Sequence, residues 1–188
     1  MKEMKNMAYR NGTYVAFDGG GDTDITSGDI RYFNLLKAWT NSKDIEFTFS
    51  DSHQKTYQVS DDSKLSTLRS RLSERINNSK NIIIILSDET KLNNRNLNWE
   101  IKRAFECELP FIIVYPDYKK IQNPNSHKNV WPNNLKNLIE ANKIKCIHIP
   151  FKKEPILDAI NQFSVVTKKY PNTSVSYYSD EAYKSWNI

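Results

Sequence analysis

The feature that most constrains this chain is a pair of short, uninterrupted apolar runs. Residues 82–86 read Ile-Ile-Ile-Ile-Leu, and residues 111–114 read Phe-Ile-Ile-Val. Neither run alternates apolar with polar side chains, as a strand with one solvated face does. We therefore expect two strands that are buried on both faces, which is typical of a parallel sheet covered by helices.

Three further apolar runs complete the expected sheet. The five expected strands cover residues 13–17, 45–49, 81–86, 111–115 and 145–150. Helical patterns lie between them, and the clearest places Leu65, Leu68 and Leu72 at spacings of three and four. Right-handed crossovers turn this alternation into a doubly wound open sheet. We predict an α/β fold of three layers, αβα, with a flavodoxin-like parallel sheet of five strands in the order 2-1-3-4-5.

The length of 188 residues fits one domain, for which we predict three parts. Residues 1–11 form an N-terminal extension, residues 12–163 the α/β domain, and residues 164–188 a C-terminal tail. The tail is rich in aromatic residues: Tyr170, Tyr177, Tyr178, Tyr183 and Trp186. Two interpretations stay open, since the tail can pack on the domain or cover a pocket or partner interface.

Composition and charge narrow the classes of function. No apolar run approaches the roughly 18 to 20 residues that span a bilayer, and residues 1–10 lack the apolar core of a signal peptide, so we expect a cytoplasmic protein without a membrane partner. The net charge of +5 is spread among 22 carboxylates, which argues against a nucleic-acid partner. Cys107 and Cys146 lack metal-binding spacing, so we expect buried thiols, no metal site and no cofactor.

In the expected sheet, a ligand cleft lies at the carboxyl ends of the strands, between the first and third. The first strand ends in Phe17, and Asp18, three glycines and Asp22 follow it. The glycines allow tight turns and a close approach of ligand to backbone, although the spacing matches neither a P-loop nor a GxGxxG motif. Asp22 is either a ligand contact or the cap of a turn.

Other candidates follow the second and third strands. His53 can act as a base or ligand contact, or can merely fix its loop. Ser87 follows the third strand, and Glu100 is expected in the first turn of the next helix, half-sheltered and favoured by the helix N-terminus. Trp99 is expected to point away from the core, toward an interface or a ligand.

The order of these motifs resembles the TIR superfamily, in particular bacterial TIR-like domains of unknown function related to the TIR proteins of the Thoeris antiphage system. The matching segments are residues 14–18, 47–53, 82–87 and 99–101. The similarity covers residues 12–163, and its most specific part is the strand that ends at Ser87 followed by Glu100 on a helix.

This resemblance implies an enzyme that consumes NAD. Catalytic TIR domains use a glutamate at this position to cleave the nicotinamide glycosidic bond, giving ADP-ribose or a cyclic variant, and Glu100 inherits that role. A glutamate with a reference pKa of about 4.3 is ionised at neutral pH, and its charge suits an oxocarbenium-like transition state. NAD is then a substrate, and the expected substrate-binding residues are Phe17, Asp18, Asp22, His53, Ser87 and Trp99.

Two alternatives stay open. Many TIR domains act as non-catalytic modules by homotypic assembly, and the polar residues 54–63 occupy the place of their assembly loop; self-association and a downstream effector protein are the partners implied. The second alternative is a phosphoacceptor receiver domain, because the positions of Asp18, Asp88 and Lys152 partly match the pattern of such a domain. The receiver pattern is incomplete, because Asp88 lies beyond Ser87 instead of closing the strand.

Overall fold

A parallel β-sheet forms the middle layer of the molecule. The computed structural model describes residues 10–19, 28–40, 49–50 and 62–188. The strands are β1 (Gly12–Ala16), β2 (Phe49–Ser50), β3 (Ser79–Ile85), β4 (Phe111–Tyr115) and β5 (Cys146–Pro150). All neighbours pair in parallel, in the order β2-β1-β3-β4-β5. The expected α/β class with a parallel sheet is confirmed, while residues 45–48 of the expected second strand lie outside the described residues.

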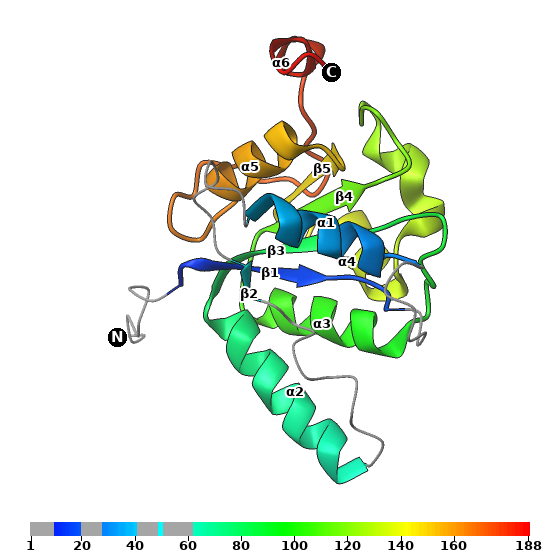
Figure 1. Cartoon of the computed structure of the whole chain (residues 1–188), viewed down its shortest axis with the longest axis vertical. Helices are drawn as coiled ribbons and strands as arrows, with labels where there is room; N and C mark the ends of the chain where they lie inside the picture. The colour runs from blue at the N-terminus through cyan, green and yellow to red at the C-terminus, as the bar shows by residue number, and fades with distance from the viewer. Residues whose placement is uncertain (1–9, 20–27, 41–48, 51–61) are drawn as a thin grey trace.

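Helices cover both faces of the sheet (Figure 1). One face carries α1 (Ile30–Thr40) and α5 (Lys153–Gln162), and the other carries α2 (Asp62–Asn77), α3 (Arg95–Glu106) and α4 (Asn133–Glu140). No helix in the described ranges has the length and apolar content that a bilayer crossing requires.

The alternation of side chains along each strand divides the core into two halves. In β3, Ile82 and Ile84 pack in the cluster under α3, and Ile83 and Ile85 pack in the cluster under α1. All four are fully buried, and each contributes about 1.5–3 kcal/mol of hydrophobic stabilisation. The uninterrupted isoleucine run is therefore explained by two covered faces.

The C-terminal segment lies along the free edge of β5. The backbone N–H of Cys146 donates to Thr173 at 3.0 Å, and that of His148 donates to Ser176 at 2.9 Å. A short helix, α6 (Asp180–Ser185), follows and stands apart from the sheet in Figure 1. The fully buried ring of Tyr183 anchors it. The segment between β4 and α4 contains a 3-10 helix, η2 (Pro124–Val130).

A buried hydrogen-bond chain, the Tyr115 network, joins β4, β5 and the C-terminal segment. Trp131 Nε1 donates to the Tyr115 hydroxyl at 2.7 Å, and this hydroxyl lies 2.8 Å from His148 Nδ1. His148 Nε2 lies 3.0 Å from the carbonyl oxygen of Ser174. Because a carbonyl only accepts, the proton is on Nε2, so Nδ1 accepts from Tyr115. Burial lowers the pKa of His148 to about 4, which keeps the ring neutral.

Candidate functional site

Glu100 and Tyr14 form a buried acid–hydroxyl pair between α3 and β1. Tyr14 points to the α3 side of the sheet, and its hydroxyl donates to Glu100 Oε1 at 2.8 Å. Only 5% of the Glu100 surface is exposed, and Tyr14 is fully buried. Among the described residues, Tyr14 is therefore the one side chain that the structure shows bonded to the Glu100 carboxyl group.

The start of α3 determines where Glu100 lies. Asn94 caps the helix, because its side-chain oxygen accepts two backbone N–H groups of the first turn, and the helix begins at Arg95. Glu100 therefore lies in the second turn, and the expectation of the first turn was wrong. The buried face of the helix comprises Leu97, Glu100, Ile101 and Ala104. Since the field of a helix N-terminus fades after the first turn, it does little for this carboxyl group.

Burial controls the protonation of Glu100. Removal from water raises its pKa to about 8, against the smaller opposing effect of the Tyr14 hydrogen bond. The carboxyl group is therefore mostly protonated at pH 7, and the expectation of a carboxylate ionised at neutral pH was wrong for this state. A carboxyl group with such a pKa can donate or accept a proton near physiological pH.

A second polar group, the Asp29 cluster, consists of Asp29, Ser87 and Thr90. Asp29 lies directly before α1 and is almost fully buried. The Ser87 hydroxyl donates to Asp29 Oδ1 at 2.5 Å, and the Thr90 hydroxyl donates to Oδ2 at 2.8 Å. Burial raises the pKa of Asp29 to about 6, although both hydrogen bonds oppose the rise. The cluster ties the loop after β3 to the start of α1.

Asp18 ties the end of β1 to the start of α3. Its carboxylate accepts the backbone N–H of Lys91 at 2.9 Å and the side-chain amide of Asn94 at 2.5 Å. Because Asn94 is the cap of α3, Asp18 helps to set the position of Glu100. Asp18 and Ser87 thus lie at the carboxyl ends of β1 and β3, the place expected from the sequence.

The remaining candidates do not converge on Glu100. Phe17 points to the opposite face of the sheet and stacks on Phe33 at 5.1 Å between ring centroids. Trp99 is half-buried against the core, with the Arg69 guanidinium 5.5 Å from its ring centroid, so the expectation that it points away from the core was wrong. Asp22 and His53 lie outside the described residues.

Sequence reasoning missed Tyr14 and Asp29 as site residues. Tyr14 shares a sheet face with Ala16, and this period of two could have paired it with a helix residue across the core. The role of Asp29 could not be predicted, because a sequence does not reveal which hydroxyl groups reach a carboxylate from a distant loop.

Within the described parts of the chain, no three histidine, cysteine or acidic side chains are grouped to hold a metal ion. A cavity of about 800 Å³ is present, but Glu100 does not line it. The cavity lies at the amino ends of the strands, because its lining includes Arg10, Leu109 and Lys145, which precede β1, β4 and β5.

Ser87→Ala is expected to destabilise the fold by about 2 kcal/mol at pH 7.5, because it removes a buried hydrogen bond to an ionised carboxylate. At pH 4.5 the loss is expected to be smaller, since Asp29, with a pKa of about 6, is then protonated. Urea unfolding at both pH values measures this difference, with the exposed Ser126→Ala as control. An equal loss at both values would contradict a role for the charge of Asp29.

Two comparisons with known proteins bear on this chain. The family model described as "Thoeris protein ThsB, TIR-like domain" matches residues 14–121, which is more than half of the chain. Both Tyr14 and Glu100 fall within the match. A crystal structure of a conserved protein from Enterococcus faecalis V583 is similar at 16% sequence identity and a TM-score of 0.39, covering 95% of this chain and 99% of that chain.

Proposed function

This chain belongs to the Thoeris ThsB TIR-like domain family, and we propose that it is a defence-related TIR signalling protein that cleaves or cyclises NAD. The observation that carries the proposal is the buried Glu100, whose pKa is raised to about 8, a shift of the kind that clusters at functional sites. We propose that the domain that contains Glu100 has a flavodoxin-like fold of three layers. We place the protein in the cytoplasm, with NAD as its substrate rather than a cofactor.

In the proposed reaction, the bond between the ribose C1′ and the nicotinamide nitrogen breaks. The electron pair passes to the nitrogen, so nicotinamide leaves as a neutral base and needs no strong acid. Water or a hydroxyl group of the same nucleotide then bonds to C1′ and releases its proton to the solvent. The ionised Glu100 stabilises the positive charge on the ribose, and it is positioned by the Tyr14 hydroxyl.

The positive charge of the substrate explains how a buried acid becomes ionised. Unit charges 4 Å apart attract by about 4 kcal/mol at an effective dielectric of 20, which corresponds to about 3 pKa units. Burial raises the pKa of Glu100 from 4.5 to about 8. The nicotinamide ring of NAD can thus offset most of that rise, and Glu100 loses its proton as the substrate binds.

The other candidate residues have supporting roles in this proposal. Asp18 and Ser87 position the loops that follow β1 and β3, and Asp22, His53 and Trp99 remain proposed substrate contacts. Phe17 leaves this set, because its buried ring packs on the face of the sheet opposite to Glu100. The receiver alternative loses support, since both oxygens of the Asp18 carboxylate already accept protein donors.

The test measures nicotinamide release from NAD by the purified wild-type chain over a wide range of protein concentration, because self-association can be required for activity. We expect release whose kcat/KM rises with pH up to about 8, since kcat/KM reports the pKa of the free enzyme and the reactive form of Glu100 is ionised. No release at any concentration would refute the enzymatic proposal. A pH-independent kcat/KM would refute the role of Glu100 as the titrating group.

A non-catalytic assembly module is the second candidate. The near-complete burial of Glu100 and its hydrogen bond to Tyr14 also suit an acid that only holds α3 against β1. In that case the partners are further copies of the chain and a downstream effector protein. Retention of antiphage signalling by Glu100→Gln would favour the module, and its loss in a folded variant would favour the enzyme.

A further inference from the structure

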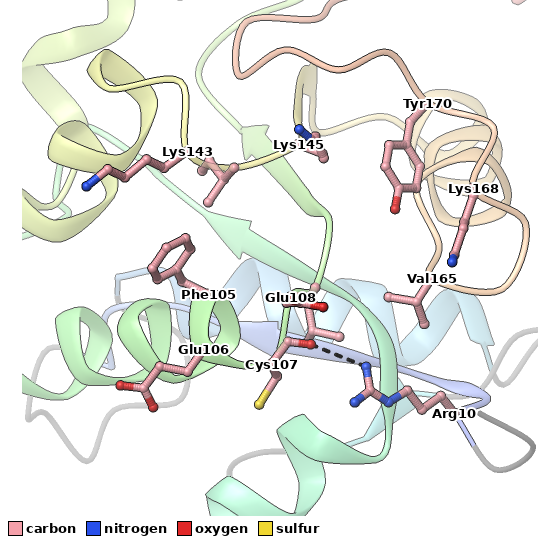
Figure 2. A pocket seen from close by; sticks show the side chains of 12 residues that line it. Arg10, Phe105, Glu106, Cys107, Glu108, Lys143, Lys145, Val165, Lys168 and Tyr170 are labelled. Atoms are coloured by element: carbon pink, nitrogen blue, oxygen red, sulfur yellow. Dashed lines mark hydrogen bonds between the residues drawn. The ribbon is translucent and has the colours of Figure 1, made fainter. Parts of the chain in front are cut away.

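The cavity at the amino ends of the strands combines a size and a chemistry that suit a small ligand (Figure 2). Its volume of about 800 Å³ lies within the range of about 300–1,000 Å³ that small-molecule sites have. The walls come from the segments that precede β1, β4 and β5 and from the segment after α5. It is therefore separated by the length of the sheet from the loops after β1 and β3.

The cavity has an excess of positive charge. Four cationic side chains line it: Arg10, Lys143, Lys145 and Lys168. Figure 2 shows Arg10, Lys145 and Lys168 on different sides of the opening. Two acidic residues also line the cavity, and one of them, Glu106, already pairs with Arg103 at 3.2 Å. The Glu108 carboxylate is then the one negative charge that offsets the four positive charges of the lining.

The lysines are available to an anion. In the described part of the chain, no carboxylate lies within ion-pair distance of Lys143, Lys145 or Lys168. The Arg10 guanidinium donates to the carbonyl oxygen of Cys107 at 3.3 Å, which holds the group against the cavity wall and leaves further N–H groups. Three unpaired ammonium groups and a held guanidinium are the donors that phosphate groups bind.

The apolar part of the wall offers a place for a flat ring. Tyr170 stacks one face on Phe163, with 5.3 Å between ring centroids, and lines the cavity with the remainder of its ring. Phe105, at 36% exposure, and Val165 also line it. A fixed aromatic ring beside apolar side chains can stack a nucleobase, while the cations around the rim reach its phosphates.

We propose that this cavity is a second binding site, which takes a nucleoside phosphate with its base against Tyr170 and its phosphates on Lys145, Lys168 and Arg10. The site requires neither Glu100 nor NAD cleavage, so it does not depend on the function proposed above. A ligand here also contacts the segment after α5 and the start of β5. Binding of the ligand therefore involves residues of the C-terminal tail.

Isothermal titration calorimetry of the full chain with ADP tests this site, with adenosine and inorganic pyrophosphate as partial ligands. We expect saturable binding of ADP with a Kd below about 1 mM, weakened by added salt. Adenosine lacks the phosphates and pyrophosphate lacks the base, so each is expected to bind about 10- to 100-fold more weakly. Absence of saturable ADP binding, or pyrophosphate binding as tightly as ADP, would overturn the proposal.

Two double variants test whether ADP binds in this cavity. Lys145→Gln with Lys168→Gln is expected to weaken ADP binding about 10- to 100-fold. The matched control is Lys152→Gln with Lys169→Gln, which removes the same charge from exposed positions outside the cavity and is expected to leave binding within about twofold of wild type. Equal weakening in both double variants would show only non-specific attraction and would overturn the site.

Two further variants distinguish binding in this cavity from binding near Glu100. Glu100→Gln is expected to leave the Kd for ADP unchanged, whereas Tyr170→Leu is expected to weaken ADP about tenfold and leave pyrophosphate unchanged. Loss of ADP binding in Glu100→Gln would place the nucleotide at the other end of the sheet and overturn the proposal. Circular dichroism of each variant confirms that the fold is retained.

Discussion

Replacement of Glu100 by glutamine is expected to reduce NAD cleavage by about a thousandfold and, at the same time, to raise the free energy of unfolding at pH 8. The loss of activity follows from the missing charge, because about 4 kcal/mol of transition-state attraction corresponds to about a thousandfold in rate. The gain in stability follows from the same burial that makes the carboxyl group reactive.

The direction of the pH dependence follows from the two protonation states. Below pH 4.5, Glu100 is protonated in both folded and unfolded chains. Between pH 4.5 and about 8 only the unfolded chain releases this proton, so the wild-type free energy of unfolding falls as the pH rises. At 1.36 kcal/mol per pH unit, the fall reaches about 5 kcal/mol. Glutamine does not titrate and avoids it.

Urea unfolding of wild type and Glu100→Gln at several pH values between 4.5 and 8 measures the difference. We expect the difference in free energy to widen steadily toward pH 8. The control is Glu106→Gln, which removes the same charge from an exposed position on the same helix and is expected to change stability by less than about 1 kcal/mol at every pH. A constant difference for Glu100→Gln would mean that this carboxyl group ionises in the folded chain at an ordinary pH.

Tyr115→Phe is expected to lower the free energy of unfolding by about 2–6 kcal/mol. The Tyr115 hydroxyl accepts from Trp131 and donates to His148, and both partners are fully buried. Removing the hydroxyl leaves an indole N–H and a ring nitrogen without these bonds, and each unsatisfied buried group costs about 1–3 kcal/mol. The loss also loosens His148, which bonds to Ser174 in the C-terminal segment.

Chemical denaturation gives the size of this effect, and limited proteolysis shows whether the C-terminal segment is cut more rapidly. Tyr118→Phe is the matched control, since this ring packs edge-on against Tyr115 and the structure records no hydrogen bond from its hydroxyl within the described residues. We expect the control to stay within about 1 kcal/mol of wild type. Similar losses in both variants would show that the Tyr115 network contributes only packing.

The sequence predicts the central strands well because their signal is local. Both faces of β3 and β4 are covered, so residues 82–85 of β3 and residues 111–114 of β4 are all apolar, and each run is visible without knowledge of its neighbours. The pairing of the C-terminal segment with β5 has no comparable signal. It depends on backbone hydrogen bonds and on an isolated β-bridge between Ser176 and Ile147, which no periodicity in residues 164–188 reveals.

The sequence predicted where two of the candidate residues lie, but it did not predict the protonation of Glu100. The carboxyl ends of β1 and β3 do bring Asp18 and Ser87 together, as topology requires. The burial of Glu100 could not be predicted in the same way. The buried face of a helix is recognised in a sequence by its apolar residues, so a glutamate on that face is not counted as part of it. Its raised pKa is a property of the packed interface between α3 and β1, and only the assembled core shows it.

The segment that runs beside β5 has a consequence for association. An uncovered outer strand presents a row of backbone donors and acceptors to which another chain can add. Here the N–H groups of Cys146 and His148, which face away from β4, are already occupied by Thr173 and Ser176 of the same chain. The C-terminal segment therefore blocks the addition of a further strand along β5.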